Sequence, residues 1–169
     1  DPETGDGAGI LLQIPHTYFK SELREFGINL PDFGSYGLGM IFYPQHYAIR
    51  KECRTIMNSL MKKMGFQLIG YRLVPVDGTV PGHESKSVEP YIEQVFIQHK
   101  DPSLTPDELE RKLFVLRHYI THSINQKVKS VNNEFYFSSL SSRTVIYKGQ
   151  LKTDQVERYF LDLKQPEVK

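Results

Sequence analysis

The chain opens with TGDGAGILLQIP at residues 4–15, a glycine-rich run that leads directly into an apolar stretch. Glycines at alternate positions permit positive φ angles and close backbone approach, so the run predicts a tight turn that feeds a buried strand. A dinucleotide-binding fingerprint has another order, with the strand first, then G-x-G-x-x-G and then a helix. Because both the order and the glycine spacing differ here, a Rossmann-type unit is excluded. The remaining functional interpretation is a loop whose small residues let a ligand or another strand lie against the main chain.

Beyond this turn, the pattern of apolar, β-branched and aromatic residues predicts six strands. They fall at residues 8–14, 37–43, 67–74, 91–97, 135–140 and 144–147. The last two are separated only by Ser141, Ser142 and Arg143, a short connection that predicts an antiparallel hairpin. Residues 75–90 contain several glycines and prolines and form a loop-rich insertion, which we expect to be the most mobile segment.

Helical periodicity is present in four stretches, at residues 16–26, 46–64 and 106–124 and after Thr153. The third has the clearest start, with Thr105 as N-cap and Glu108 completing a capping box. Gly27 is placed to cap the end of the first helix, and Thr153 is expected to cap the short final one. Strands and helices do not alternate as in a doubly wound parallel sheet, so the order favours a mixed or antiparallel α+β fold.

Composition restricts the class of protein. A chain of 169 residues forms one domain, able to bury roughly 70% of the surface that it exposes when unfolded. The 21 basic and 20 acidic residues give a net charge of +1 without a run of like charge, which argues against a nucleic-acid-binding surface. No apolar stretch is long enough for a membrane span. The single cysteine excludes an internal disulfide framework and suits a reducing compartment, for which the cytoplasm is the default.

Two candidate sites for chemistry have structural explanations. Cys53, the only thiol, falls on the apolar face of its helix, where a buried thiol is unreactive. His118 and His122 have the four-residue spacing of two zinc ligands, but Tyr119 stands where the zincin motif needs glutamate. Helical periodicity places both histidines on the solvent face. We therefore expect no metal site, and a metal-dependent hydrolase is only the third hypothesis.

The serines at 138–142 lack the G-x-S-x-G elbow of a serine nucleophile and are expected on the turn and the solvent face of the predicted hairpin. Arg143, beside that turn, is expected to be exposed. Arg72 lies within a strand, where a charge needs a partner or an open face, and a neighbouring domain could supply the partner. Asp6, between two glycines, can bond to local backbone N–H groups, which would make it a structural turn residue.

Several segments together resemble the glutamine amidotransferase domain of the glutamate synthase large chain, a class-II amidotransferase of the N-terminal-nucleophile hydrolase type. The matching segments span nearly the whole chain, and the longest is FYFSSLSSRTVIYKG. In family order they are residues 1–11, 36–42, 70–76, 94–97, 110–117, 135–149 and 159–163.

The resemblance implies an αββα sandwich of two antiparallel or mixed sheets, incomplete at both ends. In the family an amino-terminal cysteine is the nucleophile, and its expected place is upstream of Asp1. An arginine and an Asn-Gly oxyanion pair follow the YFLDL segment. None of these groups has a counterpart in the chain, so we expect the 169 residues alone to be inactive. The resemblance also implies that Thr4, Asp6 and Gly7 line the glutamine pocket of the complete domain.

The parent enzyme, by the same resemblance, hydrolyses glutamine and channels the ammonia to 2-oxoglutarate for reductive amination. It uses FMN and an iron–sulfur cluster, with NAD(P)H or ferredoxin as electron source, and none of these cofactors is expected to bind this segment. The expected partners are glutamine, the other synthase domains and a small electron-transfer subunit. The alternative hypothesis is a non-enzymatic interaction domain that keeps the amidotransferase scaffold.

Overall fold

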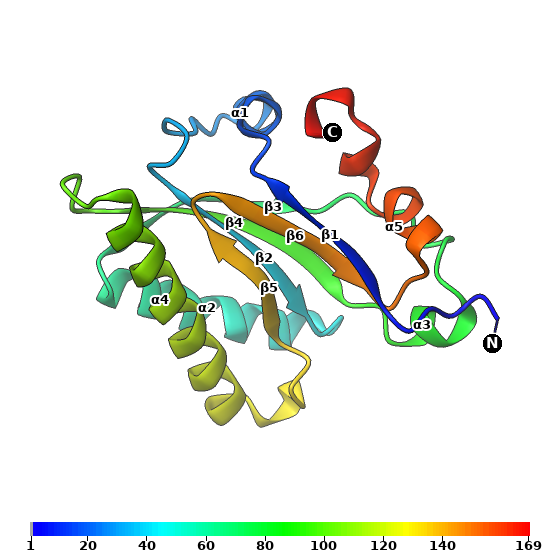
Figure 1. The fold of residues 1–169 in the computed structure, drawn as a ribbon. Coiled ribbons are helices and arrows are strands. Elements are labelled where there is room, and N and C mark those ends of the chain that lie inside the picture. Colours follow the sequence, from blue (N-terminus) through cyan, green and yellow to red (C-terminus); the bar gives the residue numbers. More distant parts are fainter. Residues whose placement is uncertain (1) are drawn as a thin grey trace.

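Two antiparallel sheets form the centre of the protein in the computed structural model, which describes residues 2–169 (Figure 1). The larger sheet has the strand order β3-β4-β2-β5, and the smaller one pairs β1 with β6. The strand bounds are β1 Ala8–Gln13, β2 Gly37–Tyr43, β3 Phe66–Leu73, β4 Tyr91–His99, β5 Tyr136–Ser141 and β6 Thr144–Gly149. All six predicted strands are present, and the predicted α+β class with two antiparallel sheets is confirmed.

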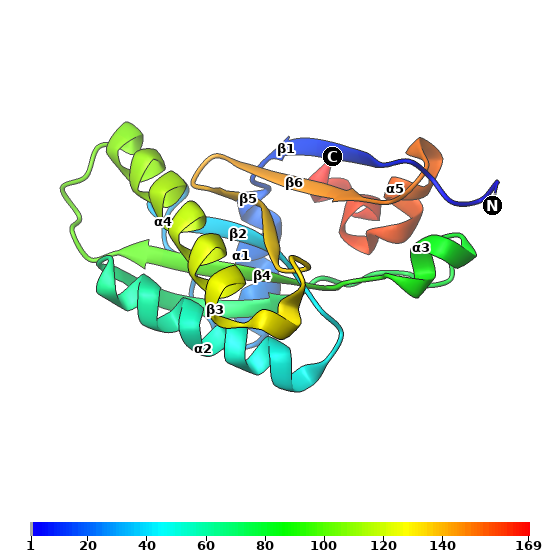
Figure 2. The same ribbon diagram turned by 90° about the horizontal axis from the view of Figure 1, so that it is seen from below.

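Helices lie on both sides of the larger sheet. The long helices α2 (Tyr47–Lys63) and α4 (Pro106–Lys127) cover one face. The β1–β6 ribbon, α1 (His16–Glu25) and a C-terminal segment cover the other face. In Figure 2 the β1–β6 ribbon and α2 lie on opposite sides of β3 and β4. The C-terminal segment comprises α5 (Thr153–Tyr159), η2 (Leu161–Lys164) and η3 (Pro166–Val168).

Strand β2 divides the interior into two hydrophobic cores, because successive side chains of a strand point to opposite faces. Met40 and Phe42 join the core on the side of α1 and β6. Ile41 and Tyr43 join the core beneath α2 and α4. Every residue of β2 is buried, so this strand is the centre of the layered structure.

Gly27 caps the C-terminal end of helix α1, as predicted. This glycine has a φ of +74°, and its N–H donates to the carbonyl of Arg24 at 3.0 Å. The N–H of Ile28 donates to the carbonyl of Leu23 at 2.9 Å. These two bonds make a Schellman motif, in which a left-handed residue satisfies the last carbonyls of a helix.

The capping box at the start of α4 is also confirmed. The Thr105 hydroxyl accepts a hydrogen bond from the Glu108 N–H, and the Glu108 carboxylate accepts one from the Thr105 N–H at 2.8 Å.

We expect Thr105→Ala to lower the free energy of unfolding by about 1 kcal/mol, because one N–H of the first turn loses its acceptor. Urea denaturation followed by circular dichroism measures this loss. Thr105→Ser keeps the hydroxyl and is the matched control; equal losses in the two variants would contradict the capping role.

Two local predictions were wrong. Strands β5 and β6 do not form the predicted hairpin ladder, since β5 pairs with β2 and β6 pairs with β1. The two strands are instead joined through hydroxyls: Ser138 donates to the Ile146 carbonyl at 2.8 Å, and Ser139 accepts from the Ile146 N–H at 3.0 Å. Thr153 is the first residue of α5 rather than its cap, which is Lys152.

The segment at 75–90, predicted as a loop, contains a short helix, α3 (His83–Ser87). Its first part is tied to the C-terminal segment, because Val76 forms a bridge with Phe160 and the Asp77 N–H donates to the Tyr159 carbonyl at 2.8 Å. Its expected mobility stays a prediction.

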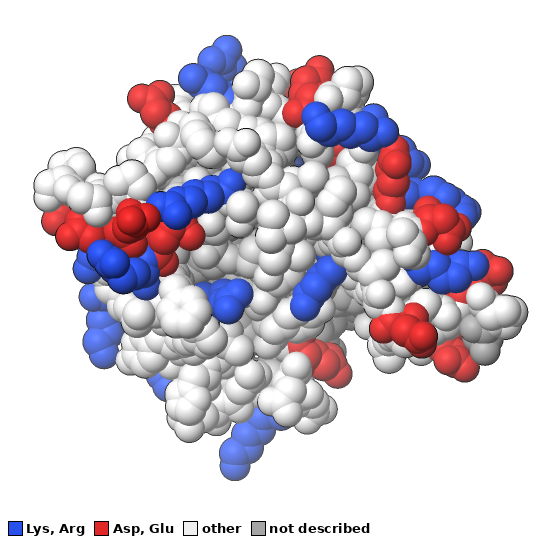
Figure 3. All heavy atoms as spheres, in the orientation of Figure 1, with Lys and Arg blue, Asp and Glu red and all other residues white. Residues whose placement is uncertain are grey.

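Charged side chains of both signs are interspersed on the face shown in Figure 3. A band with few charges crosses the middle of this face, over the region where β1, β6 and β5 lie in Figure 1. Ile10 and Leu11 of β1 are among the exposed apolar residues of the chain, with 41% and 61% of their surface accessible.

Candidate functional site

The glycine-rich turn borders an open hollow at the start of β1. Asp6 and Gly7 are among its lining residues, together with residues of β1, of β6 and of the loop that follows β6. Gly7 has a φ of +136°, which strongly favours glycine. Thr4 is not among the lining residues of this hollow. The structure therefore brings two of the three predicted pocket residues to one surface.

Asp6 does not have the local bonding that would make it a structural turn residue. Its side chain is exposed, and within residues 2–169 it makes no hydrogen bond or ion pair. The local bonds proposed for an aspartate between two glycines are therefore not found, and the carboxylate faces solvent beside the hollow.

Close packing explains why the turn needs glycine at its start. A Cβ on Gly5 would lie less than 3.0 Å from the backbone of Leu151 and Lys152. The turn is held to α5 on this side, since Gln155 donates to the Glu3 carbonyl at 3.0 Å and Lys152 pairs with the Glu3 carboxylate at 3.1 Å.

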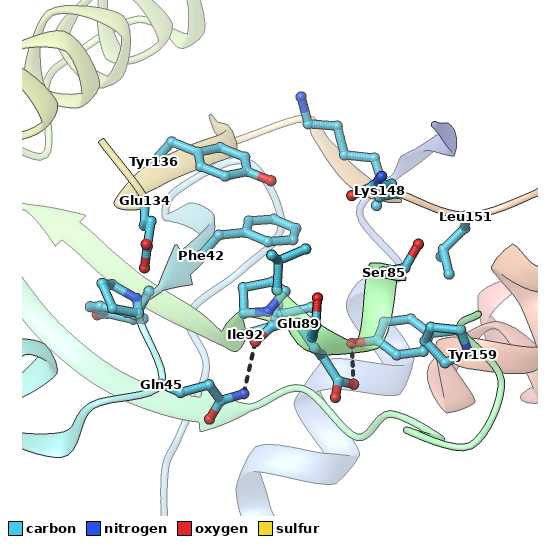
Figure 4. Close-up of a pocket in the computed structure, with 18 residues that line it drawn as sticks. Phe42, Gln45, Ser85, Glu89, Ile92, Glu134, Tyr136, Lys148, Leu151 and Tyr159 are labelled. Carbon is cyan, nitrogen blue, oxygen red and sulfur yellow. Dashed lines mark hydrogen bonds between the residues drawn. The ribbon is translucent and has the colours of Figure 1, made fainter. Parts of the chain in front are cut away.

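A second, more enclosed cavity of about 440 Å³ (Figure 4) adjoins this hollow. The two share four lining residues, which are Tyr136, Lys148, Gly149 and Gln150. One wall is the stacked pair of Phe42 and Tyr136, whose ring centroids lie 4.7 Å apart. The volume falls within the range of small-molecule pockets.

Polar groups line the opposite wall of the cavity. The Tyr159 hydroxyl donates to the Glu89 carboxylate at 2.9 Å, a bond drawn in Figure 4. Burial and the neighbouring Glu89 charge raise the pKa of the Tyr159 phenol, so it stays protonated and able to donate. The Ser85 hydroxyl is buried and has no hydrogen-bond partner among residues 2–169.

A buried ion pair lies between β3 and η2. The Arg72 guanidinium donates two hydrogen bonds to the Asp162 carboxylate, at 2.7 and 2.8 Å. The exposed fraction of the side chain is 5% for Arg72 and 0% for Asp162. Arg72 therefore finds its partner within this chain, and the possible neighbouring domain is not needed.

Other side chains complete this buried network. Tyr18 of α1 and Tyr147 of β6 each donate to Asp162 at 2.9 Å. Arg72 also donates to Gln94 of β4 and to Glu22 of α1, both at 3.0 Å. The network thus links α1, β3, β4, β6 and η2 with directional bonds, as a buried charge requires.

The network also sets the protonation states of the arginine and the two tyrosines within it. Burial opposes the charge of Arg72, but the bonds to Asp162 outweigh it and hold the pKa of the guanidinium above its usual range. Burial and the Asp162 charge raise the pKa values of Tyr18 and Tyr147, so both phenols remain donors. Sequence reasoning missed Asp162, Gln94 and Tyr147; the only signal for them was a charged residue within the predicted strand at 67–74.

Cys53 has the structural role that the sequence predicted. Its side chain is fully buried in the core beneath α2 and α4. Burial raises the pKa of the Cys53 thiol to about 11, so the nucleophilic thiolate is scarce at neutral pH.

We expect Cys53 in the native protein to resist thiol reagents at pH 7–8 and to react only at the rate of unfolding. Labelling with iodoacetamide, read by mass spectrometry of the peptide that contains Cys53, measures this rate with and without urea. Rapid labelling of the native protein would contradict a buried thiol.

The next candidates are the two histidines that have the spacing of zinc ligands. His118 and His122 are exposed on α4, as predicted, and His118 packs against the ring of Phe114 with centroids 4.4 Å apart. Within residues 2–169 no group of three or more His, Cys, Asp or Glu side chains could hold a metal ion.

The serines were placed wrongly. Residues 138–142 are buried rather than exposed, because their hydroxyls have partners inside the protein. Ser141 and Ser142 donate to the Glu110 carboxylate of α4, at distances between 2.6 and 3.1 Å. Arg143 is exposed as predicted, with an ion pair to Asp107 at 2.5 Å.

Comparison with known proteins places the chain in a family. The model of the class-II glutamine amidotransferases matches residues 1–169.

None of the helices described for residues 2–169 is long and apolar enough to cross a bilayer.

Several curated relatives match nearly the whole chain. The glutamate synthase [NADPH] large chain of Bacillus subtilis is 39% identical over 163 residues, which are 96% of this chain. The ferredoxin-dependent glutamate synthase 2 of Arabidopsis thaliana is 36% identical over 96% of the chain, and the glutamate synthase [NADH] of Schizosaccharomyces pombe is 34% identical over 99%. The chain spans only 8–10% of the length of these relatives. It belongs to the class-II glutamine amidotransferases, with a fold of two antiparallel sheets flanked by helices.

Proposed function

We propose that residues 1–169 are part of the glutaminase domain of a glutamate synthase, which hydrolyses glutamine to glutamate and ammonia. The supporting observation is the family match over the whole chain, together with the three relatives reported above, each of which is named a glutamate synthase. The electron donors in their names differ, being NADPH, ferredoxin and NADH. The similarity therefore supports the use of glutamine and leaves the electron donor of this protein open.

The proposed chemistry is nucleophilic catalysis. A cysteine thiolate attacks the side-chain amide carbonyl of glutamine, ammonia leaves, and water releases glutamate from the thioester. Cys53 is unsuited to this attack, because its thiol is buried away from both hollows and protonated. We therefore propose that the nucleophile comes from outside residues 1–169, and that these residues alone do not turn over glutamine.

The ammonia is proposed to reach 2-oxoglutarate in another domain of the same protein, where reductive amination gives glutamate. The flavin and the iron–sulfur cluster that this step uses belong to that domain in our proposal. A cluster needs several thiolate ligands, and the chain has one cysteine, which does not fit such a site. A small electron-transfer subunit remains part of the proposal.

Within these residues, we propose that the turn containing Thr4, Asp6 and Gly7 lines the glutamine pocket, with Asp6 and Gly7 at the open hollow and Thr4 two residues before Asp6 in the same turn. The free Asp6 carboxylate beside the open hollow supports this assignment, since it is suited to hold the ammonium group of an amino acid.

The test uses the full-length polypeptide that carries these residues. We expect glutamine-dependent formation of glutamate from 2-oxoglutarate, and a KM for glutamine that rises about tenfold in Asp6→Asn, as removal of one charged hydrogen bond implies. Asp101→Asn, in a loop away from the hollow, is the matched control. Absence of glutamine hydrolysis in the wild-type protein would overturn the proposed function and favour a scaffold domain. An unchanged KM in Asp6→Asn would remove Asp6 from the pocket.

A further inference from the structure

The C-terminal segment connects the buried ion pair to the glycine-rich turn. Asp162 lies in η2, directly after α5, and is bonded to Arg72 of β3. At the other end of α5, Gln155 and Lys152 hold Glu3, and Gly5 packs against the backbone of Leu151 and Lys152. One short helix therefore contacts the turn at its start and leads into the ion pair at its end.

The same segment also holds the loop that forms the far wall of the cavity. The Leu161 N–H donates to the Pro75 carbonyl at 3.1 Å, and Gln155 donates to the Val80 carbonyl at 3.2 Å. Tyr159 reaches Glu89 within the cavity. A shift of α5 would thus move the turn and the cavity wall together.

Apolar packing by itself would leave the position of this segment loosely defined. Phe160 and Leu163 are buried in the core, but such contacts are non-directional and tolerate small displacements. Asp162, in contrast, accepts four hydrogen bonds from three different elements, at 2.7–2.9 Å. In several proteins, buried polar groups with fixed partners select one arrangement among similar packings.

We infer that Arg72 and Asp162 are a positioning pair for the glutamine pocket, because they fix η2 to β3 and thereby set where α5 holds the residue 3–7 turn. This inference rests on the proposed function, in which that turn lines the pocket. Neither residue contacts the hollow beside the turn, so the pair acts on substrate binding only through α5.

The test compares two ion pairs on opposite faces of the larger sheet in the full-length protein. Arg72→Met/Asp162→Leu replaces the pair by apolar side chains of similar size, a change that buried ion pairs often tolerate for folding. Arg54→Met is the control, because Arg54 pairs with the buried Glu93 and lies in α2, whose core is on the opposite face of the larger sheet from that of α5. Arg72→Lys keeps the charge with a weaker geometry.

We expect kcat/KM for glutamine to fall about tenfold to a hundredfold in the double variant, as a small displacement of a binding group implies. The change should lie mainly in KM, because the turn binds substrate and does not carry the chemistry. Arg72→Lys should give a smaller rise in KM. Activity with ammonia in place of glutamine should stay unchanged, and Arg54→Met should lower stability without changing the KM for glutamine.

Hydrogen exchange gives a readout independent of turnover. The backbone amides of residues 3–9 should exchange faster in the double variant than in the wild type. Their exchange rates should be unchanged in Arg54→Met. If the double variant does not fold, the KM for glutamine and the hydrogen exchange of residues 3–9 in Arg72→Lys test the positioning role instead. A wild-type protein without glutamine turnover overturns the proposed function. Wild-type turnover combined with an unchanged KM and unchanged exchange in the variants overturns the positioning role alone.

Discussion

Replacing Asp162 by alanine is expected to lower the free energy of unfolding by about 3–5 kcal/mol, among the largest effects of a single substitution in this chain. The variant leaves the Arg72 guanidinium, only 5% exposed, without the carboxylate that neutralises it. Tyr18 and Tyr147 each lose their acceptor as well. Glu22 and Gln94 remain as partners of Arg72, so the loss should fall within this range rather than above it.

Urea denaturation of the wild type, Asp162→Leu, Arg72→Met and the Arg72→Met/Asp162→Leu double variant completes a cycle that measures the coupling. We expect the double variant to be markedly more stable than the sum of the single losses implies, because no fully buried charge is left without a partner. Arg143→Met, which breaks the exposed pair with Asp107, is the control and should change stability little, since solvent screens such pairs. Additive losses in the cycle would contradict a coupled buried pair.

The elements of the fold were predictable because their signals are local. Apolar residues at helical spacing marked α2 and α4, and the Thr105–Glu108 pair fixed the start of α4 to the residue. The assignment of β5 and β6 to different sheets was not predictable, because a short connection is compatible with either pairing. The hydroxyls of Ser138 and Ser139 in β5 bond to the backbone of Ile146 in β6 and replace part of the expected ladder. These bonds allow the two serines to be buried.

The polar network was beyond sequence reasoning for a different reason. Arg72 and Asp162 are separated by 90 positions, and a lone charge in a strand only indicates that some partner exists. Asp6 illustrates the reverse case. Its glycine neighbours suggested local bonding, but the carboxylate is exposed and makes no hydrogen bond or ion pair within residues 2–169.

Gly5→Ala is the second substitution with a large expected effect. Its Cβ would overlap backbone atoms of Leu151 and Lys152, which cannot move without displacing the start of α5. Overpacking against side chains costs about 1–3 kcal/mol, and here the obstacle is backbone, so we expect a loss of at least about 3 kcal/mol. Thermal denaturation and the KM for glutamine should both change, because the displaced turn carries Asp6.

Gly78→Ala is the matched control for this change. A Cβ on Gly78 would meet the Lys86 ammonium, the end of a flexible side chain that can move away. We therefore expect Gly78→Ala to leave both the unfolding temperature and the KM for glutamine near their wild-type values. If Gly5→Ala were as mild as Gly78→Ala, the close contact between the turn and α5 would be absent in solution. The route by which Asp162 is proposed to position the pocket would then be lost as well, so this pair of variants tests the packing on which the inference depends.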